Sequence, residues 1–271
     1  MFNQISSQAS KLINLTKKKY NKSKTKVIAV TSGKGGVGKS TFTANLSYTL
    51  SSNNKKVLVI DADIGLANMQ ILFDIKPIYT INDYLQNNIS IDKILLKTKY
   101  DNISLVAGKS GHSFLLENSQ NQFSRVIREI KALEKYDYIL IDTGAGLNSQ
   151  VQEFLDISDE IIAITTTDPS ALTDVYALIK MLSLSKKRLF LVFNQTKTFK
   201  IGQTITNSLI NLASKNRLNK NFMVKYIGNI DADSNIATTG RIRKLYAKEL
   251  TYSECAISLE QISKNLRNEI N

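Results

Sequence analysis

The 271-residue sequence has few of the residues that build disulfides, metal clusters and membrane spans. Cys255 is its only cysteine, which excludes an internal disulfide and a cysteine-rich iron–sulfur site within one chain. His112 is its only histidine, which argues against a histidine-based zinc site. No apolar run approaches the ~20 residues that cross a bilayer, and the first residues lack the apolar centre of a signal peptide. We therefore expect a soluble cytoplasmic protein.

Acidic residues are fewer than basic ones, and the basic excess is unevenly placed. The chain carries 36 Lys and Arg against 23 Asp and Glu, for a net charge of +13. Seven lysines and no acidic residue fall within residues 1–26, so more than half of this charge precedes the first apolar run. The chain has only two prolines and is rich in Lys, Asn and Ile, and such a genomic bias accounts for much of the remaining excess. Without a clustered basic patch, we expect that the folded body does not bind nucleic acid.

Short apolar runs recur along the chain, with helical spacings between them. Strands that alternate with helices predict an α/β fold, a doubly wound and mainly parallel sheet with helices on both faces. The predicted strands are 27–30, 57–60, 103–107, 138–141, 161–165, 189–193 and 223–227. The predicted helices between them are 41–52, 80–87, 113–135, 148–157, 170–184 and 202–216.

We expect one folded domain, residues 26–271, behind a basic arm formed by residues 1–25. At the far end, residues 253–271 predict an amphipathic helix. Its apolar face consists of Leu259, Ile262, Leu266 and Ile270. The opposite face has no excess of basic residues or aromatics, so packing on the sheet is favoured and peripheral contact with a membrane is the alternative.

A glycine-rich turn separates the first predicted strand from the first predicted helix. Residues 31–41 read TSGKGGVGKST, which fits the pattern G-x-x-x-x-G-K-[ST] from Gly33 to Ser40. Glycines let backbone N–H groups converge on a phosphate, and the helix start adds the positive end of its dipole. Lys39 is then expected to reach the β- and γ-phosphates, and Ser40 to offer its hydroxyl to Mg²⁺. A plain glycine turn with solvated lysines is the alternative.

Lys34 is not required by an ordinary phosphate loop, and it carries a family resemblance. KGGVGKST, from Lys34 to Thr41, resembles the deviant Walker A motif of the MinD/ParA class of P-loop ATPases. In that class ATP lies between two protomers, and the first lysine reaches the partner's nucleotide. The resemblance implies an ATP-dependent homodimer in which Lys34 and Lys39 offset charge on the transferred phosphoryl group. The implied nucleotide-binding residues are Gly33, Lys34, Gly35, Gly36, Val37, Gly38, Lys39, Ser40 and Thr41.

Two apolar strands end in acidic residues, in VLVIDAD (57–63) and YILID (138–142). The resemblance implies that Asp63 orients the attacking water, that Asp61 supports the metal shell and that Asp142 holds Mg²⁺ through water. Gly144 and Gly146, which follow Asp142, permit a turn near the γ-phosphate. The alternative is that acids at strand ends are merely solvated.

Two later segments resemble the parts of the family that contact the base. Asn194 ends the strand 189–193, where adenine-recognising members have an asparagine. Asp233 lies in a segment that aligns more loosely with the adenine-edge loop, and Asp231 stands where relatives usually have proline. For Asn194 the alternative is a residue that caps or turns the chain.

Within this class the sequence is most similar to the FlhG family (also called FleN or YlxH), which controls flagellar number and placement. The resemblance spans about residues 26–250 and is carried by DADIGLANM (61–69) and TTTDPSALTDVYALIK (165–180). MinD itself usually has an arginine at the position of Ala67. The single cysteine argues against the nitrogenase iron protein and Mrp-type carriers, since both need paired cysteines.

The N-terminal segment carries a weaker version of an FlhG motif. FlhG proteins often have D-Q-A-x-x-L-R, which stimulates the GTPase FlhF. Here Gln8, Ala9 and Leu12 keep the spacing, but Ser7 and Ile13 replace the two charged residues. FlhF is the implied partner of this arm, and a disordered basic arm is the alternative.

The resemblance therefore implies a slow switch ATPase that uses ATP and Mg²⁺ and controls flagellar assembly. Its implied partners are a second copy, FlhF, and a flagellar C-ring protein or transcriptional regulator at the cytoplasmic face of the membrane or the cell pole. The alternatives are MinD-like division-site positioning on a membrane and ParA-like segregation on DNA.

Overall fold

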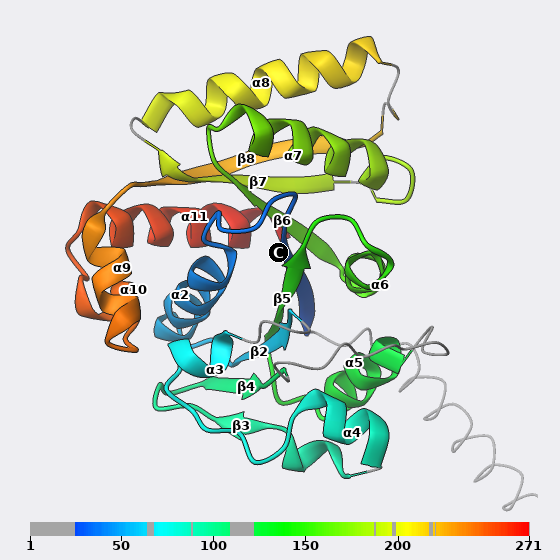
Figure 1. The fold of residues 1–271 in the computed structure, drawn as a ribbon, viewed down its shortest axis with the longest axis vertical. Helices are drawn as coiled ribbons and strands as arrows, with labels where there is room; N and C mark the ends of the chain where they lie inside the picture. The colour runs from blue at the N-terminus through cyan, green and yellow to red at the C-terminus, as the bar shows by residue number, and fades with distance from the viewer. Residues whose placement is uncertain are drawn as a thin grey trace, which may run out of the picture.

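The fold is built on one eight-stranded sheet (Figure 1). The computed structural model describes residues 25–270 except 64–67, 88, 109–121, 187, 197–198, 217–218 and 220. The strand order is β3-β4-β2-β5-β1-β6-β7-β8. The strands are β1 (Lys26–Ser32), β2 (Val57–Ala62), β3 (Leu96–Lys97), β4 (Ile103–Val106), β5 (Tyr138–Ala145), β6 (Glu160–Thr165), β7 (Arg188–Thr196) and β8 (Met223–Asp231).

All seven predicted strands are present and pair in parallel, and the prediction missed β3. That strand is two residues long and antiparallel to β4, with Leu96 opposite Leu105. The predicted doubly wound, mainly parallel fold is confirmed. The predicted arm of residues 1–25 lies outside the described residues except for Thr25.

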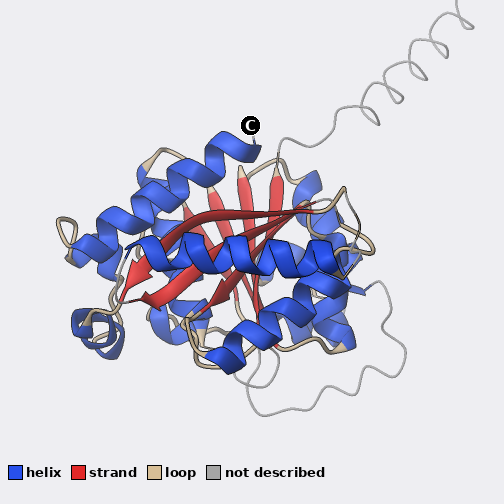
Figure 2. Cartoon of the chain, turned by 90° about the horizontal axis from the view of Figure 1, so that it is seen from above, coloured by secondary structure: helices blue, strands red, loops and turns tan. Residues whose placement is uncertain are grey.

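Helices cover both faces of the sheet (Figure 2). On one face lie α2 (Lys39–Ser52), α3 (Met69–Leu72), α10 (Tyr246–Glu249) and α11 (Glu254–Ile270). On the other lie α4 (Ile81–Asn87), α5 (Gln122–Ala132), α6 (Ser149–Ile157), α7 (Pro169–Leu182) and α8 (Phe199–Lys215). Two further helices are η1 (Ile91–Lys93) and α9 (Ser234–Arg241). The six helices predicted between the strands are all found, although residues 113–121 of one of them lie outside the described residues.

Burial on both faces explains why the central strands read as continuous apolar runs. In β1, the four residues from Val27 to Val30 are fully buried. Ile28 and Val30 belong to the cluster that includes α2 and α11, whereas Ala29 packs with α6 and α7. A parallel sheet covered on both faces favours a continuous apolar run, and β1 has one from Val27 to Val30.

The C-terminal helix α11 is part of the core. Its predicted apolar face, Leu259, Ile262, Leu266 and Ile270, is at most 5% exposed and packs with α2 and β8. This confirms the predicted packing on the sheet, and the same face is not free to meet lipid. Within the described part of the chain, no helix is both long and apolar enough to pass through a bilayer.

The strand order brings the predicted site segments together. β1 lies beside β5, and β5 lies beside β2, all parallel. Their carboxyl ends therefore share one edge of the sheet, where ligands of open α/β sheets bind. The loop after β1, the end of β2 and the end of β5 meet at that edge (Figure 1).

Candidate functional site

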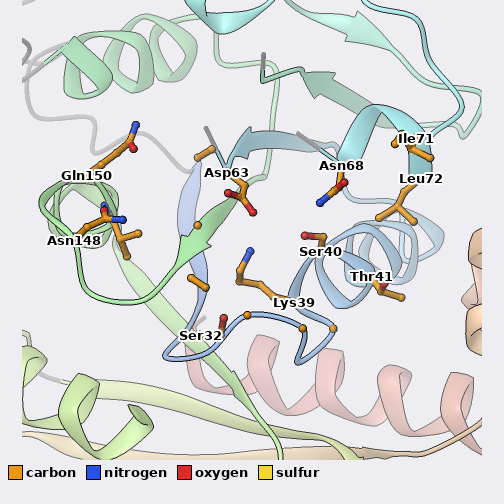
Figure 3. Close-up of a pocket in the computed structure, with 17 residues that line it drawn as sticks. Ser32, Lys39, Ser40, Thr41, Asp63, Asn68, Ile71, Leu72, Asn148 and Gln150 are labelled. Carbon is orange, nitrogen blue, oxygen red and sulfur yellow. The ribbon is translucent and has the colours of Figure 1, made fainter. Parts of the chain in front are cut away.

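A cavity of about 660 Å³ opens at the carboxyl edge of the central strands. The loop between β1 and α2, together with the first turn of α2, forms one wall with Gly35, Gly36, Gly38, Lys39, Ser40 and Thr41. α3 and the start of α6 form the others (Figure 3). Most of the predicted phosphate loop therefore faces a single cavity.

Glycine is required in this loop for two physical reasons. Gly36 and Gly38 have φ angles of 79° and 88°, in the left-handed region that side chains disfavour. A Cβ on Gly38 would lie 2.3 Å from Asn194 Nδ2. Gly38 is also the N-cap of α2 and supplies no side-chain cap, so the first N–H groups of the helix remain available to an anion.

Lys39 and Asp142 form a buried ion pair beneath the loop. Lys39 Nζ lies 3.2 Å from Asp142 Oδ1, and the two side chains are 7% and 1% exposed. Burial raises the pKa of Asp142, and the Lys39 charge and the hydroxyls of Ser40 and Thr43 oppose that rise. Asp142 Oδ2 is buried and has no hydrogen-bond partner among the described residues.

Asp61 lies next to Asp142 in the sheet, since the two are paired in the register of β2 and β5. It is fully buried, and its two oxygens accept hydrogen bonds from the backbone N–H groups of Met69 at 3.0 Å and Asp63 at 3.3 Å. Burial, with a further contribution from the Asp142 charge, raises the pKa of Asp61 to about 7. Asp61 thus anchors both ends of the segment 63–69 from below the cavity.

Asp63 lines the cavity itself. Figure 3 shows its carboxylate and the Lys39 ammonium pointing into the same space. Gly144 lies beside this carboxylate, since a Cβ there would be in ordinary van der Waals contact with Asp63 Oδ1, at 3.5 Å. The structure therefore brings together Lys39, Ser40 and Asp63 at the cavity and places Asp142 directly beneath.

Lys34 faces away from the cavity that its own loop forms. It is exposed, and its Nζ donates to Ser170 Oγ in α7 at 2.8 Å. Gly33, beside it, packs closely on the same helix, because a Cβ there would lie 2.5 Å from Asp174 Cβ. The Lys34 ammonium is thus exposed and bonded to α7, and it does not line the cavity.

The two predicted base-contacting residues have partners within the protein. Asn194 Nδ2 donates to the Val37 carbonyl oxygen at 2.8 Å, which ties the end of β7 to the phosphate loop. Asp233 is the N-cap of α9, accepts from Asn235 N at 2.8 Å and contacts Cys255 Sγ at 3.7 Å. Neither residue lines the cavity described above, so their predicted contacts with adenine stay predictions.

Several cavity residues escaped sequence reasoning, namely Asn68, Ile71, Leu72, Asn148 and Gln150 (Figure 3). Asn148 accepts a hydrogen bond from Val151 N at 2.9 Å as the N-cap of α6. An asparagine at the first position of a predicted helix, here 148–157, is a capping signal, so its place at this helix start could have been found. The others carry no comparable local signal.

The residues at the cavity fit a magnesium nucleotide. Among the described residues, no group of three or more His, Cys, Asp or Glu side chains could hold a metal on its own. Mg²⁺ does not need such a cage, since it keeps several waters and uses one or two carboxylates together with phosphate oxygens. The unpartnered Asp142 Oδ2 and the open start of α2 suit those two requirements.

Comparison with known sequences finds a matching family model and relatives of known name. A family model described as an AAA domain matches residues 25–201. The flagellum site-determining protein YlxH of Helicobacter pylori is 37% identical over 266 residues, which cover 96% of this chain and 90% of the relative. The antiactivator FleN of Pseudomonas aeruginosa is 33% identical over 158 residues, or 58% of this chain and 56% of FleN.

Solved structures share the fold. The cell division ATPase MinD of Pyrococcus furiosus superposes with a TM-score of 0.78 at 24% identity, covering 90% of this chain and 99% of that one. MinD of Pyrococcus horikoshii, solved as a complex with Mg-ADP, gives a TM-score of 0.76 at 24% identity, covering 89% and 96%. At this identity the likeness concerns the fold alone.

Proposed function

This chain belongs to the MinD/ParA family of P-loop ATPases, and we propose that it is a flagellar switch that hydrolyses ATP slowly between two copies of itself. The flagellar assignment is supported by the match to YlxH, which extends over 96% of this chain. The nucleotide assignment is carried by one observation, the buried Lys39–Asp142 pair under the open start of α2.

We propose that the phosphates bind at the backbone N–H groups of residues 33–41 and that Lys39 turns from Asp142 toward them. Bound Mg-ATP supplies the phosphoryl group whose transfer to water the metal assists by neutralising charge. Ser40 and Asp142 would hold the metal, Asp61 would support them through the segment it anchors, and Asp63 would orient the attacking water. Asn194 and Asp233 are proposed at the base, Asn194 with its amide already holding the loop.

The exposure of Lys34 supports a role in a second protomer. Lys34 does not line its own cavity, and an exposed cation of this loop is available to a neighbouring site. We propose that two protomers face each other across ATP and that each Lys34 reaches the partner's phosphates, as an arginine finger does. Each site would then be incomplete in the monomer.

Such a dimer works as a switch because ATP would shift the population toward a state with a different surface. Proteins of this kind form complexes with other proteins, as in the MinC:MinD complex of Aquifex aeolicus. For this chain we propose FlhF, bound through residues 1–25, and a C-ring protein or transcriptional regulator at the cytoplasmic face of the membrane. Stimulation of FlhF GTPase activity by a peptide of residues 1–25 would test the first of these.

The biochemical test combines sizing with phosphate release. We expect the full chain to be a monomer without nucleotide, to dimerise with Mg²⁺ and a non-hydrolysable ATP analogue, and to release phosphate from ATP at a slow rate. The Lys39→Ala variant should neither dimerise with the analogue nor release phosphate from ATP. A chain that stays monomeric with the analogue, or hydrolyses no ATP, contradicts the proposal.

The cellular test separates the flagellar role from its alternatives. Deletion of the gene should change the number or position of flagella and leave division-site placement intact. Altered division with normal flagella would instead support a MinD-like role, and salt-sensitive binding of the protein to nonspecific DNA would support a ParA-like one.

A further inference from the structure

A threonine one turn into α2 contacts the same carboxylate oxygen as the loop lysine. Thr43 is fully buried, and its hydroxyl lies 3.2 Å from Asp142 Oδ1 and 3.0 Å from the Lys39 carbonyl oxygen. Lys39 Nζ lies 3.2 Å from that same Oδ1. The Lys39 ammonium and the Thr43 hydroxyl, whose single proton is shared with the Lys39 carbonyl oxygen, therefore both lie on one oxygen of Asp142, while Oδ2 has no hydrogen-bond partner among the described residues.

This arrangement orients the carboxylate. A carboxylate can turn about its Cβ–Cγ bond unless donors fix one of its oxygens. Because Thr43 is β-branched and sits in a helix, its own side chain has few rotamers available. A donor of fixed direction on Oδ1 thus also fixes the direction in which the free Oδ2 is presented.

Lys39, Ser40 and Thr43 all lie near Asp142 and lower its pKa, but nucleotide binding would affect them differently. Under the proposed function, Lys39 turns to the phosphates and Ser40 to the metal. Thr43 does not line the cavity, and its hydroxyl has no phosphate or metal to turn to. It would remain on Oδ1 when the other two have left.

We propose that Thr43 is a positioning residue that holds Asp142 Oδ1 so that Oδ2 is directed at the magnesium ion of the bound nucleotide. This inference rests on the proposed function, since it concerns the bound state. Hydrogen bonds to charged groups are among the stronger ones, and removal of this one should weaken metal binding with little effect on contacts to the nucleotide alone.

Thr49 offers a matched control in the same helix. It is also buried, at 5% exposure, and its hydroxyl also donates to the carbonyl oxygen four residues earlier, that of Asn45 at 3.1 Å. Among the described residues, its hydroxyl has no carboxylate partner. Thr43→Val and Thr49→Val therefore make the same chemical change, and only the first removes a hydrogen bond to Asp142.

The test measures the dissociation constant of ADP by calorimetry, once with Mg²⁺ and once with EDTA, for the full chain. We expect Thr43→Val to reduce the affinity gained from magnesium by about tenfold, the equivalent of one such hydrogen bond. Its affinity in EDTA should stay within about twofold of the wild type. Thr43→Ser, which keeps the hydroxyl, and Thr49→Val should retain the full gain. If Thr43→Val does not fold, Thr43→Ala removes the same hydroxyl without a branched side chain.

The outcomes separate this inference from the function on which it rests. If the wild type gains affinity from magnesium and the variant without the hydroxyl gains equally, Thr43 does not position Asp142. A loss in Thr43→Ser as large as in Thr43→Val assigns the effect to packing and also overturns the inference. If the wild type binds ADP under neither condition, the proposed function itself fails.

Discussion

Two lysines of one loop, five positions apart, have opposite environments. Lys39 is buried against Asp142, whereas Lys34 is exposed and bonded to Ser170. We expect Lys34→Ala to keep ADP affinity within about threefold, because Lys34 makes no contact with its own cavity. Its ATP turnover should fall at least ~100-fold, since a charge supplied by the partner in this way is worth 10³–10⁵ in rate.

Phosphate release and ADP titration of Lys34→Ala and Lys39→Ala check this expectation together. Lys39→Ala should lose both affinity and turnover. Unchanged turnover in Lys34→Ala would remove the proposed role in the partner's site, even if the protein still dimerises.

Asp61 makes stability depend on pH. Its pKa is raised from 3.8 in the unfolded chain to about 7 by burial beside Asp142. Between these values the folded protein holds a proton that the unfolded chain has released, so higher pH favours unfolding. The contribution of Asp61 to the unfolding free energy is fully present below pH 3.8 and is lost as the pH rises through about 7. Because the pKa of Asp142 is raised as well, the two carboxyls titrate as a pair.

We therefore expect the unfolding free energy of the wild type, relative to Asp61→Asn, to fall between pH 4.5 and 7.5. The fall should be on the order of 2 kcal/mol or more in magnesium-free buffer. Urea denaturation at several pH values measures it. The variant also loses an acceptor for the backbone of Met69 or Asp63, but that loss shifts its curve without changing the slope. Parallel curves for the two proteins would contradict the raised pKa.

At the scale of elements, strands were easier to predict than short helices. The seven predicted strands each leave a local apolar signal, and those in the middle of the sheet are buried on both faces, whereas β8 at the edge has exposed residues. β3 has only two residues at a sheet edge and leaves none. α9 reads SNIATTGR, whose Thr and Gly residues disfavour a helix, and it forms with the Asp233 cap at its start. Its existence depends on tertiary context.

In the site, too, features with a local sequence signal could be predicted and features that depend on tertiary structure could not. The phosphate loop is a contiguous motif, so its residues could be assigned from the sequence and meet at one cavity. The contact of Thr43 with Asp142 joins residues 99 apart, and that of Asn194 with Val37 joins residues 157 apart. Such contacts depend on strand order and register, which the apolar pattern does not encode.

The helix α11 supplies a prediction about packing. Leu266 is fully buried in the core, whereas Ile257 in the same helix is 59% exposed. Leu266→Ala should lower the unfolding free energy by about 2–5 kcal/mol, because it leaves a cavity between α11 and its neighbours. Ile257→Ala should change it by less than about 0.5 kcal/mol. Urea denaturation compares the two, and equal small effects would mean that α11 is not held on the sheet.

At the scale of the whole molecule, the groups proposed for association and for hydrolysis lie apart. Asp63 lines the cavity, Asp142 lies beneath it, and Lys34 is exposed and bonded to α7 outside the cavity lining. If two copies close on ATP, association and hydrolysis are separate steps that use different residues. The lifetime of the dimer is then set by how fast the water in each site reacts.

This separation predicts the behaviour of Asp63→Ala. The variant keeps the loop, Lys34 and Lys39, so it should bind Mg-ATP and dimerise as the wild type does. It lacks the carboxylate proposed to orient water, so phosphate release should fall by at least ~100-fold, within the range attributed to general bases. Sizing with ATP should therefore show a dimer that persists for hours, while the wild type returns to monomer as ATP is consumed. Lys34→Ala,Asp63→Ala separates the two steps further, because loss of the dimer in the double variant assigns Lys34 to association as well as to chemistry. Hydrolysis by Asp63→Ala at the wild-type rate would show that another group orients the water.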